Sequence, residues 1–239
     1  VQTTIQRIVD TIGPPDVVFC NAGTAKAQSF EDISTDTFDH LIKTNFLGSV
    51  YVTKAVLPFM KNNNNNNNNN GGSGGGTLVY TSSMAGLVGV FGYTAYTPTK
   101  FALRGFAEAL QMEVRRDDIS VVLTFPPDTD TPGFKIENEG KPKETDLISE
   151  TAGLYDPQKV AEVIASKCLV PNPPFCVYFG LEGWMLSTLT AGMSPVHSLI
   201  DAVCQVTLMG ILRLVSLFYL WDFSRIIANN NNNNNQTTT

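Results

Sequence analysis

The 239-residue sequence predicts an α/β fold built on a doubly wound parallel sheet. Three observations lead to this prediction. Short apolar runs, of the kind that parallel sheets bury on both faces, alternate with longer stretches of helical periodicity. Turns that contain Gly and Pro separate the two kinds of segment. The chain length and the 43% content of hydrophobic residues are sufficient for one good-sized core.

The individual elements follow from the local pattern. Short, β-rich apolar runs are predicted as strands, and they occupy residues 16–20, 77–83, 120–125 and 176–180. Stretches with helical periodicity or helix-start residues are predicted as helices, and they occupy residues 1–12, about 35–61, about 93–115 and 157–169. Residues 128–153 are rich in charge, Gly and Pro, so we expect a loop there.

Composition divides the chain into regions. Residues 1–183 contain all the predicted strands and form one expected domain. Within it, residues 62–76, NNNNNNNNNGGSGGG, are expected to form a flexible surface insert, because a polar repeat has nothing to bury. Such an insert is tolerated because closure entropy grows only slowly with loop length. Residues 229–239 are Asn-rich and are expected to form a disordered tail.

The region between, residues 184–228, is strongly apolar. Its core, VCQVTLMGILRLVSLFYLW, is long enough to span a bilayer, but Gln205, Arg213 and Ser216 would form one narrow polar stripe along a helix. Such a helix can lie in a membrane interface, pack in a homodimer, span a bilayer with Arg213 covered, or belong to a soluble core. We expect membrane association, with the choice between a span and an interfacial helix left open.

Charge and cysteine content argue against two other classes of function. The net charge of −6, with no basic block, argues against a nucleic-acid partner. The four cysteines are scattered, with no CxxC pair and no histidine at ligand spacing. We therefore expect free thiols in a reducing compartment and no metal site. His40 and His197 stand alone, and we expect neither to act as a ligand or a base.

Several residues follow one another in an order that predicts a single crevice. Asn21, with Ala22 and Gly23, follows the first predicted strand directly, and Ser83 ends the second. Tyr96 begins the helix after that strand. Ligands of doubly wound sheets bind at the carboxyl ends of the strands, where these residues would meet.

The stretch YTPTKFAL carries the chemistry of this crevice. Residues four apart share a helix face, so Lys100 would lie beside Tyr96. A nearby ammonium favours the phenolate, and we expect it to lower the tyrosine pKa and make a better acid–base group. Ser83 would hold a substrate carbonyl oxygen beside Tyr96, which suits hydride delivery to a ketone. Pro98 fits the first turn of a helix, so we expect the helix to begin a residue or two before it.

Together with Asn45 in the preceding helix, these residues resemble the short-chain dehydrogenase/reductase family, which has a Rossmann-like fold. The resemblance covers residues 1 to about 180 outside the Asn/Gly insert. It implies a catalytic tetrad, and the four residues are Ser83, Tyr96, Lys100 and Asn45. It also implies that Lys100 binds the nicotinamide ribose and that Asn45 holds a water in a proton relay.

The same resemblance implies two further groups of cofactor contacts. Asn21, Ala22 and Gly23 would stabilise the sheet and line the adenosine side of the cofactor site. On the nicotinamide side the contacts would come from Pro126, Asp128 and Thr129. Pro127, between Pro126 and Asp128, stands where the family usually has glycine, so the nicotinamide-side contacts depart from the family pattern.

A narrower resemblance is carried by FPPDTDTPGF, LISET, MLSTLTAGMSPV and the apolar tail. These stretches are similar to the branch of the family that reduces 3-ketosphinganine. The resemblance implies a long-chain keto-base substrate, NADPH as cofactor, and a place in sphingolipid synthesis at the endoplasmic reticulum membrane, with the active site facing the cytosol. Two alternatives remain: a reductase of another lipid or steroid ketone, and a non-catalytic fragment.

One family motif is not found in the sequence. The turn TGxxxGxG, which binds the pyrophosphate at the start of the first helix, has no match, and GGSGGG precedes a strand instead of following one. We therefore expect the chain to begin in the third helix of the family fold and to lack about three strands of the sheet. Residues 16–20 would then form an exposed, apolar edge strand.

Overall fold

The computed structural model describes residues 1–68, 75–150 and 153–236. Within these residues the strands form one parallel sheet in the order β1–β2–β3–β4, which confirms the predicted fold class. The strand bounds are Val17–Cys20, Thr77–Thr81, Ser120–Phe125 and Cys176–Tyr178. The register aligns one residue of each strand across the sheet, namely Cys20, Tyr80, Leu123 and Cys176. The carboxyl ends of all four strands therefore reach the same edge.

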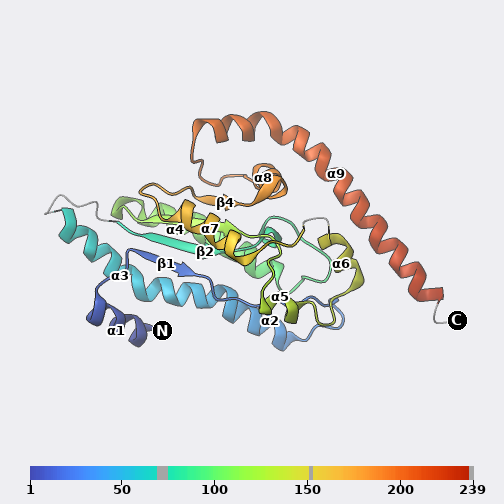
Figure 1. The fold of residues 1–239 in the computed structure, drawn as a ribbon, viewed down its shortest axis with the longest axis horizontal. Helices are drawn as coiled ribbons and strands as arrows, with labels where there is room; N and C mark the ends of the chain where they lie inside the picture. Colours follow the sequence, from blue (N-terminus) through green and yellow to red (C-terminus); the bar gives the residue numbers. More distant parts are fainter. Residues whose placement is uncertain (69–74, 151–152, 237–239) are drawn as a thin grey trace.

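The helices and turns lie between and beyond these strands (Figure 1). The α-helices are α1 Gln2–Ile12, α2 Thr35–Leu41, α3 Gly48–Asn68, α4 Thr97–Val114, α5 Pro132–Glu137, α6 Lys143–Ser149, α7 Pro157–Cys168, α8 Gly180–Leu189 and α9 Leu199–Gln236. Three short turns complete the described set: the π-helical η1 Ile42–Leu47 and the 3-10 turns η2 Met84–Gly86 and η3 Arg115–Asp117.

Helices cover both faces of the sheet, as a doubly wound fold requires. On one face, α3 and α4 pack against alternate residues of β2 and β3, and the cluster includes Val56, Met60, Leu103, Leu110, Leu78, Tyr80, Val121 and Leu123. On the other face, α7 packs against the intervening residues, and that cluster includes Val160, Cys168, Val79, Val122 and Val177. Period-two alternation along the strands thus supplies both faces of the core.

The edge strand β1 is paired only with β2 among the described strands. Its Phe19 is 44% exposed, and Val17 and Val18 are partly exposed. An apolar strand with a free row of backbone groups favours pairing with another chain. The structure therefore has the exposed apolar edge that the sequence predicts.

Two predicted loops differ from the structure. Helix α3 continues to Asn68, so the first part of the predicted insert 62–76 is helical, and its residues 69–74 lie outside the described chain. Extending an existing helix is easy, because each further residue adds a hydrogen bond without a new nucleation step. The predicted loop 128–153 contains α5 and α6. Helix α5 begins there because the Thr131 side chain caps it at Phe134 N and Pro132 follows at its first position.

The apolar C-terminal region forms α8 and the long α9. In Figure 1, α9 runs along the outside of the molecule, and it packs against α8 and α6. It extends to Gln236, so the predicted disordered tail is helical up to that residue, and residues 237–239 lie outside the described chain. Leu199–Asn230 is long and apolar enough to cross a membrane, with a mean hydropathy of 1.8, and 6% of its most apolar window is buried.

Arg104 of α4 anchors the connection between α8 and α9. Its guanidinium donates hydrogen bonds to the carbonyl oxygens of Thr190 (2.5 Å) and Ala191 (3.0 Å) and to Ser194 Oγ (2.9 Å). It also pairs with Glu108 at 2.9 Å. The planar guanidinium donates along several directions at once, which suits a junction of this kind. Helix α4 thus supports the connection between α8 and α9.

Candidate active site

The first turn of α4 places Tyr96 and Lys100. Tyr96 is the N-cap residue, Thr97 begins the helix, and Pro98 lies in the first turn, as the sequence predicts. The hydroxyl of Thr99 donates to the Tyr96 carbonyl oxygen at 2.7 Å and fixes this turn. Lys100 is only 5% exposed, and its Nζ lies 5.5 Å from the centroid of the Tyr96 ring. The two side chains therefore share one face at the start of the helix.

Ser83 reaches the same point from the end of β2. It is the N-cap residue of η2, and its Oγ accepts a hydrogen bond from Ala85 N at 3.2 Å. The Ser83 side chain also lies beside the Tyr96 phenol and lowers its pKa. Lys100 Nζ donates to the carbonyl oxygen of Thr81 at 2.9 Å, which ties the helix to the same strand end. The structure thus brings together three of the four residues predicted to be catalytic.

Asn45, the fourth predicted catalytic residue, forms hydrogen bonds with the backbone of the loop after β1. It lies in the π-helical turn η1, and π-helical turns are frequent at functional sites. Its Nδ2 donates to the Thr24 carbonyl oxygen (2.9 Å) and to Thr99 Oγ1 (3.0 Å), and its Oδ1 accepts from Thr24 N (2.9 Å). Asn45 is 1% exposed. It therefore fastens the loop after β1 to the first turn of α4.

The loop after β1 is open to solvent and close to Lys100. Asn21, Ala22 and Gly23 are exposed. A Cβ atom added at Gly23 would lie 3.3 Å from Asn45 Oδ1 and 3.6 Å from Lys100 Nζ. A side chain there would press on these two groups, so the glycine leaves the approach to the ammonium clear.

The loop after β3 forms the opposite side of the crevice. The carbonyl oxygen of Pro126 accepts a hydrogen bond from Met84 N at 3.2 Å, and Thr129 Oγ1 donates to the Pro127 carbonyl oxygen at 2.8 Å. Asp128 is partly buried, and burial raises the pKa of its carboxyl group, while the charge of Lys141 lowers it. The predicted nicotinamide-side residues therefore lie at the same strand edge as Ser83.

A cavity of about 800 Å³ joins these groups. Its lining includes most of the predicted site residues, which are Asn21, Gly23, Ser83, Tyr96, Lys100, Pro126, Asp128 and Thr129. It continues along apolar side chains of α8 and α9, which include Met185, Leu186, Leu189, Leu212, Val215, Leu220 and Phe223. The volume and the contrast between a polar end and an apolar wall are typical of small-molecule sites.

The electrostatics of the tyrosine differ from the prediction. Burial raises the pKa of the Tyr96 phenol, the negative charge of Glu137 raises it further, and the neighbouring Ser83 side chain lowers it. The sequence predicted a lowered pKa, on the strength of Lys100 alone. That prediction is wrong for this arrangement, because burial and the charge of Glu137 both raise the pKa and the ammonium is directed to Thr81.

Lys100 is itself affected by its surroundings. Burial lowers the pKa of its ammonium to about 8, and the charge of Glu137 acts in the opposite direction. Tyr96 keeps its proton at neutral pH and has one to give, although its raised pKa makes it a weaker acid than a free phenol. The arrangement can therefore protonate an oxygen atom held between Ser83 and Tyr96.

Sequence reasoning missed several groups in this cavity. Tyr93 and Glu137 line it, and the Tyr93 hydroxyl donates a hydrogen bond to Glu137 Oε1. Glu137 was missed because its segment was predicted to be a loop. The helix-start pair Thr131–Pro132 is the signal that could have placed it. The cavity-facing residues of α8 and α9 had no signal, because an apolar helix does not reveal which side faces a ligand.

The residues present fit the ribose and nicotinamide end of a dinucleotide. Tyr96 and Lys100 bring hydroxyl and ammonium donors to the strand edge, and Gly23 leaves space above them. The Lys100 ammonium has three protons, of which one is used by Thr81. Ligands of doubly wound sheets bind at the carboxyl edge of the sheet, and this edge has hydrogen-bond donors for a ribose.

Comparison with known proteins finds relatives that are named as reductases of the same kind. Residues 1–142 match the short chain dehydrogenase family. A 3-dehydrosphinganine reductase of Danio rerio and a 3-ketodihydrosphingosine reductase of Bos taurus are each 44% identical over 227 residues, or 95% of this chain. A 3-dehydrosphinganine reductase of Arabidopsis thaliana is 39% identical over 223 residues, or 93% of this chain. The chain spans 65% of the length of the first two relatives and 66% of the third.

Solved structures share the fold. A short-chain dehydrogenase from Streptomyces avermitilis is similar with a TM-score of 0.63 at 25% identity, over 78% of this chain and 68% of that one. An alcohol dehydrogenase from the archaeon Thermococcus sibiricus, complexed with 5-hydroxy-NADP, is similar with a TM-score of 0.57 at 25% identity. That match covers 71% of this chain and 63% of the archaeal one.

Proposed function

The chain belongs to the short-chain dehydrogenase/reductase family, and from this premise we propose that it reduces the 3-keto group of 3-ketosphinganine to a hydroxyl, with NADPH as cofactor. The product would be sphinganine, an intermediate of sphingolipid synthesis. The observation that carries the proposal is the placement of Ser83, Tyr96 and Lys100 together at the polar end of a cavity whose other end is apolar. The names of the similar reductases support the same substrate.

The geometry at Tyr96 supports the proposed proton step. NADPH, when bound, supplies the hydride that adds to the ketone carbon. The ketone oxygen takes the place between the hydroxyls of Ser83 and Tyr96, where both can donate hydrogen bonds to it. As negative charge develops on that oxygen, Tyr96 gives it the phenolic proton. The C=O double bond becomes a C–OH group, and Tyr96 is left as a phenolate.

Lys100 supports this step in two ways. Its ammonium, 5.5 Å from the Tyr96 ring, stabilises the phenolate after the proton has left. Its remaining N–H groups are available to the ribose of the cofactor. Asn45 binds the Thr24 backbone and the Thr99 side chain, so it positions the loop after β1 and the first turn of α4, which both lie beside Lys100.

The choice of a long-chain substrate rests on the apolar wall. Side chains of α8 and α9 line the cavity beyond the polar end, among them Leu186, Leu212 and Leu220. An alkyl chain that leaves water for this wall gains about 0.8 kcal/mol for each buried CH₂ group. A ketone with a long alkyl chain therefore uses the whole cavity, whereas a short ketone would use only one end.

The proposed location is the endoplasmic reticulum membrane, with the active site on the cytosolic side. Large apolar residues on α9 are exposed, including Val206 (83%), Leu214 (69%) and Phe218 (64%). An exposed apolar helix is stabilised by insertion into the acyl chains of a bilayer. The other side of the same helix lines the cavity, so a substrate dissolved in the membrane would meet the site beside the helix.

The experiment that tests the function is an NADPH-oxidation assay with a panel of ketones. The panel contains 3-ketosphinganine, other long-chain ketones and steroid ketones, and NADH replaces NADPH in a parallel series. We expect turnover of the keto base with NADPH and a lower kcat/KM for the steroids. Turnover of a steroid in preference to the keto base would support a different lipid reductase. No NADPH oxidation with any ketone would contradict a catalytic role for this chain.

A further inference from the structure

Glu137, the last residue of α5, places a carboxylate in the cavity that also holds Ser83 and Tyr96. The hydroxyl of Tyr93 donates a hydrogen bond to Glu137 Oε1. The centroid of the Tyr93 ring lies 5.5 Å from that of Tyr96. Tyr93 therefore contacts both the Glu137 carboxylate and Tyr96, the proposed proton donor.

The charge of Glu137 acts directly on the reacting end of the cavity. It raises the pKa of Tyr96 and opposes the lowering of the Lys100 pKa, and in both cases it is the strongest of the charged groups. Asp128, a second cavity carboxylate, affects Tyr96 less. Glu182 also lines the cavity, but it is exposed on α8. Among these three carboxylates, Glu137 thus has the strongest electrostatic effect on Tyr96 and Lys100.

Glu137 forms no ion pair within 4.0 Å in the described part of the chain. Lys100 donates instead to the Thr81 carbonyl oxygen. Lys141 lies 3.8 Å from Asp146, and the charges of Lys141 and Lys100 act on Glu137 without a direct ion pair. Burial raises the pKa of the Glu137 carboxyl group, and a partly buried carboxylate is stabilised by any cation that enters beside it.

We propose that Glu137 binds the ammonium group of the substrate and so selects ketones that carry an amine on the carbon next to the carbonyl. This inference rests on the proposed function, because 3-ketosphinganine has its amine at that carbon. An α-amino group has a pKa of about 8 and is largely protonated at neutral pH. With the ketone oxygen between Ser83 and Tyr96, covalent geometry keeps the ammonium within a few ångströms of Tyr96. A charge-assisted hydrogen bond to Glu137 would then fix the orientation of the ketone.

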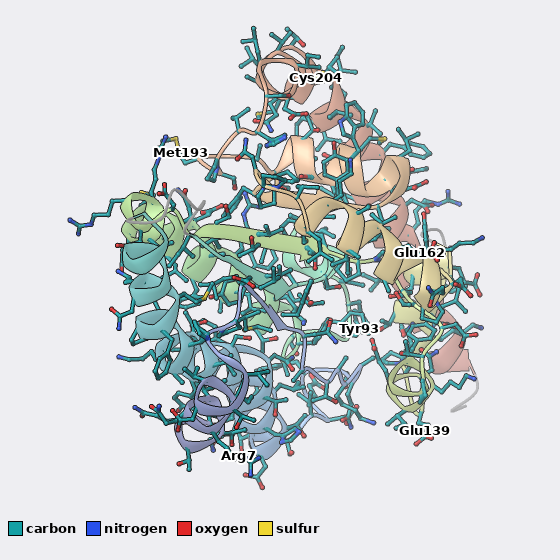
Figure 2. The ribbon with its side chains drawn as sticks, turned by 60° about the vertical axis from the view of Figure 1, so that its left-hand side comes forward. Arg7, Tyr93, Glu139, Glu162, Met193 and Cys204 are labelled. Atoms are coloured by element: carbon teal, nitrogen blue, oxygen red, sulfur yellow. The ribbon has the colours of Figure 1, made fainter. Side chains whose placement is uncertain are left out.

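The test compares Glu137→Gln with the wild type and with a matched control, Glu139→Gln. The amide of the first variant would keep an oxygen acceptor for the Tyr93 hydroxyl, so the substitution removes charge and preserves the fold. Glu139 is an exposed carboxylate two residues away, and Figure 2 shows it at the rim of the molecule, outside Tyr93. A thermal unfolding midpoint for each protein confirms that all three are folded.

Two substrates are given to each protein: the keto base, and the same long-chain ketone with hydrogen in place of the amine. We expect Glu137→Gln to lower the ratio of kcat/KM for the amine ketone over the neutral ketone by roughly tenfold to a hundredfold. We expect Glu139→Gln to keep the wild-type ratio. An unchanged ratio in Glu137→Gln, or an equal loss on both ketones, would overturn the inference, because it would leave Glu137 a structural role only.

A binding experiment separates this inference from the proposed function. The affinity of each protein for a long-chain amine is compared with that for its neutral N-acetyl derivative. A preference for the amine that is lost in Glu137→Gln supports the ammonium site even when no ketone is reduced. Failure of all three proteins to reduce either ketone would contradict the reductase function alone. Equal affinity of the wild type for the two ligands would contradict the ammonium site.

Discussion

The side chain of Asn45 and the backbone of Thr24 are joined by two hydrogen bonds, each 2.9 Å long. A third bond of 3.0 Å links Asn45 to Thr99. One buried amide therefore holds the loop after β1 against the first turn of α4. Its donors and its acceptor are used together, which makes it a rigid connection between two walls of the crevice.

Replacing Asn45 with Ala should lower the free energy of unfolding by about 1–3 kcal/mol, because buried polar partners lose their hydrogen bonds. Cofactor affinity should fall as well, since the loop that carries Gly23 is released. Denaturant unfolding and cofactor titration measure the two effects. The exposed Asn172 provides the control, and Asn172→Ala should leave both values within experimental error. Equal stability of the two variants would show that the Asn45 bonds contribute little.

Replacing Tyr96 with Phe should reduce kcat by about a hundredfold to ten thousandfold, since it removes only the proton donor. Binding of NADPH should persist, because Lys100 and the loop after β1 remain. Steady-state turnover and cofactor fluorescence titration provide the two readings. Tyr51→Phe, at an exposed position of α3, is the control and should keep full activity. Retained turnover in Tyr96→Phe would mean that another group supplies the proton.

Lys100 should make stability depend on alkaline pH. Its pKa is lowered from 10.5 to about 8 by burial, so between these values the unfolded chain binds a proton that the folded chain has lost. Stability from this group therefore increases as pH rises from about 8 to 10.5, by on the order of 3 kcal/mol. Unfolding of the wild type and of Lys100→Met should be compared at pH values across this window. Subtraction of the two curves removes the other titrating groups, and parallel curves would contradict the lowered pKa.

The exposed side of α9 should bind lipid. Leu214 (69% exposed) and Leu217 (46% exposed) do not line the cavity, so changing both to Glu leaves the cavity wall intact. We expect the double variant to lose most of its co-sedimentation with phospholipid vesicles, because two carboxylates would enter the acyl region. Leu154→Glu, at an exposed position outside α9, is the control. Unchanged vesicle binding, or a dimer that dissociates in the double variant, would favour a protein partner for this surface.

Much of the fold could be predicted because the relevant signals are local. Apolar runs place the four strands, and the start of α4 follows from Pro98, whose missing N–H has no partner to lose in a first turn. Asn21 and Ser83 follow strand ends and Tyr96 begins the next helix, an order that predicted that they would meet, and the structure places them around one cavity. Helix α5 could have been predicted from the cap at Thr131, whereas α6 has no side-chain cap and its polar composition is typical of a loop.

The sequence by itself determined which groups are present and in which order they come, since the order of strands and helices fixes which loops reach the catalytic edge. Only the tertiary structure decided how those groups behave. Burial reversed the expected pKa shift of Tyr96, because desolvation depends on everything packed around the phenol and not on one neighbour in the chain. The approach of Glu137, and of the cavity wall on α8 and α9, likewise depends on long-range packing that no local pattern specifies.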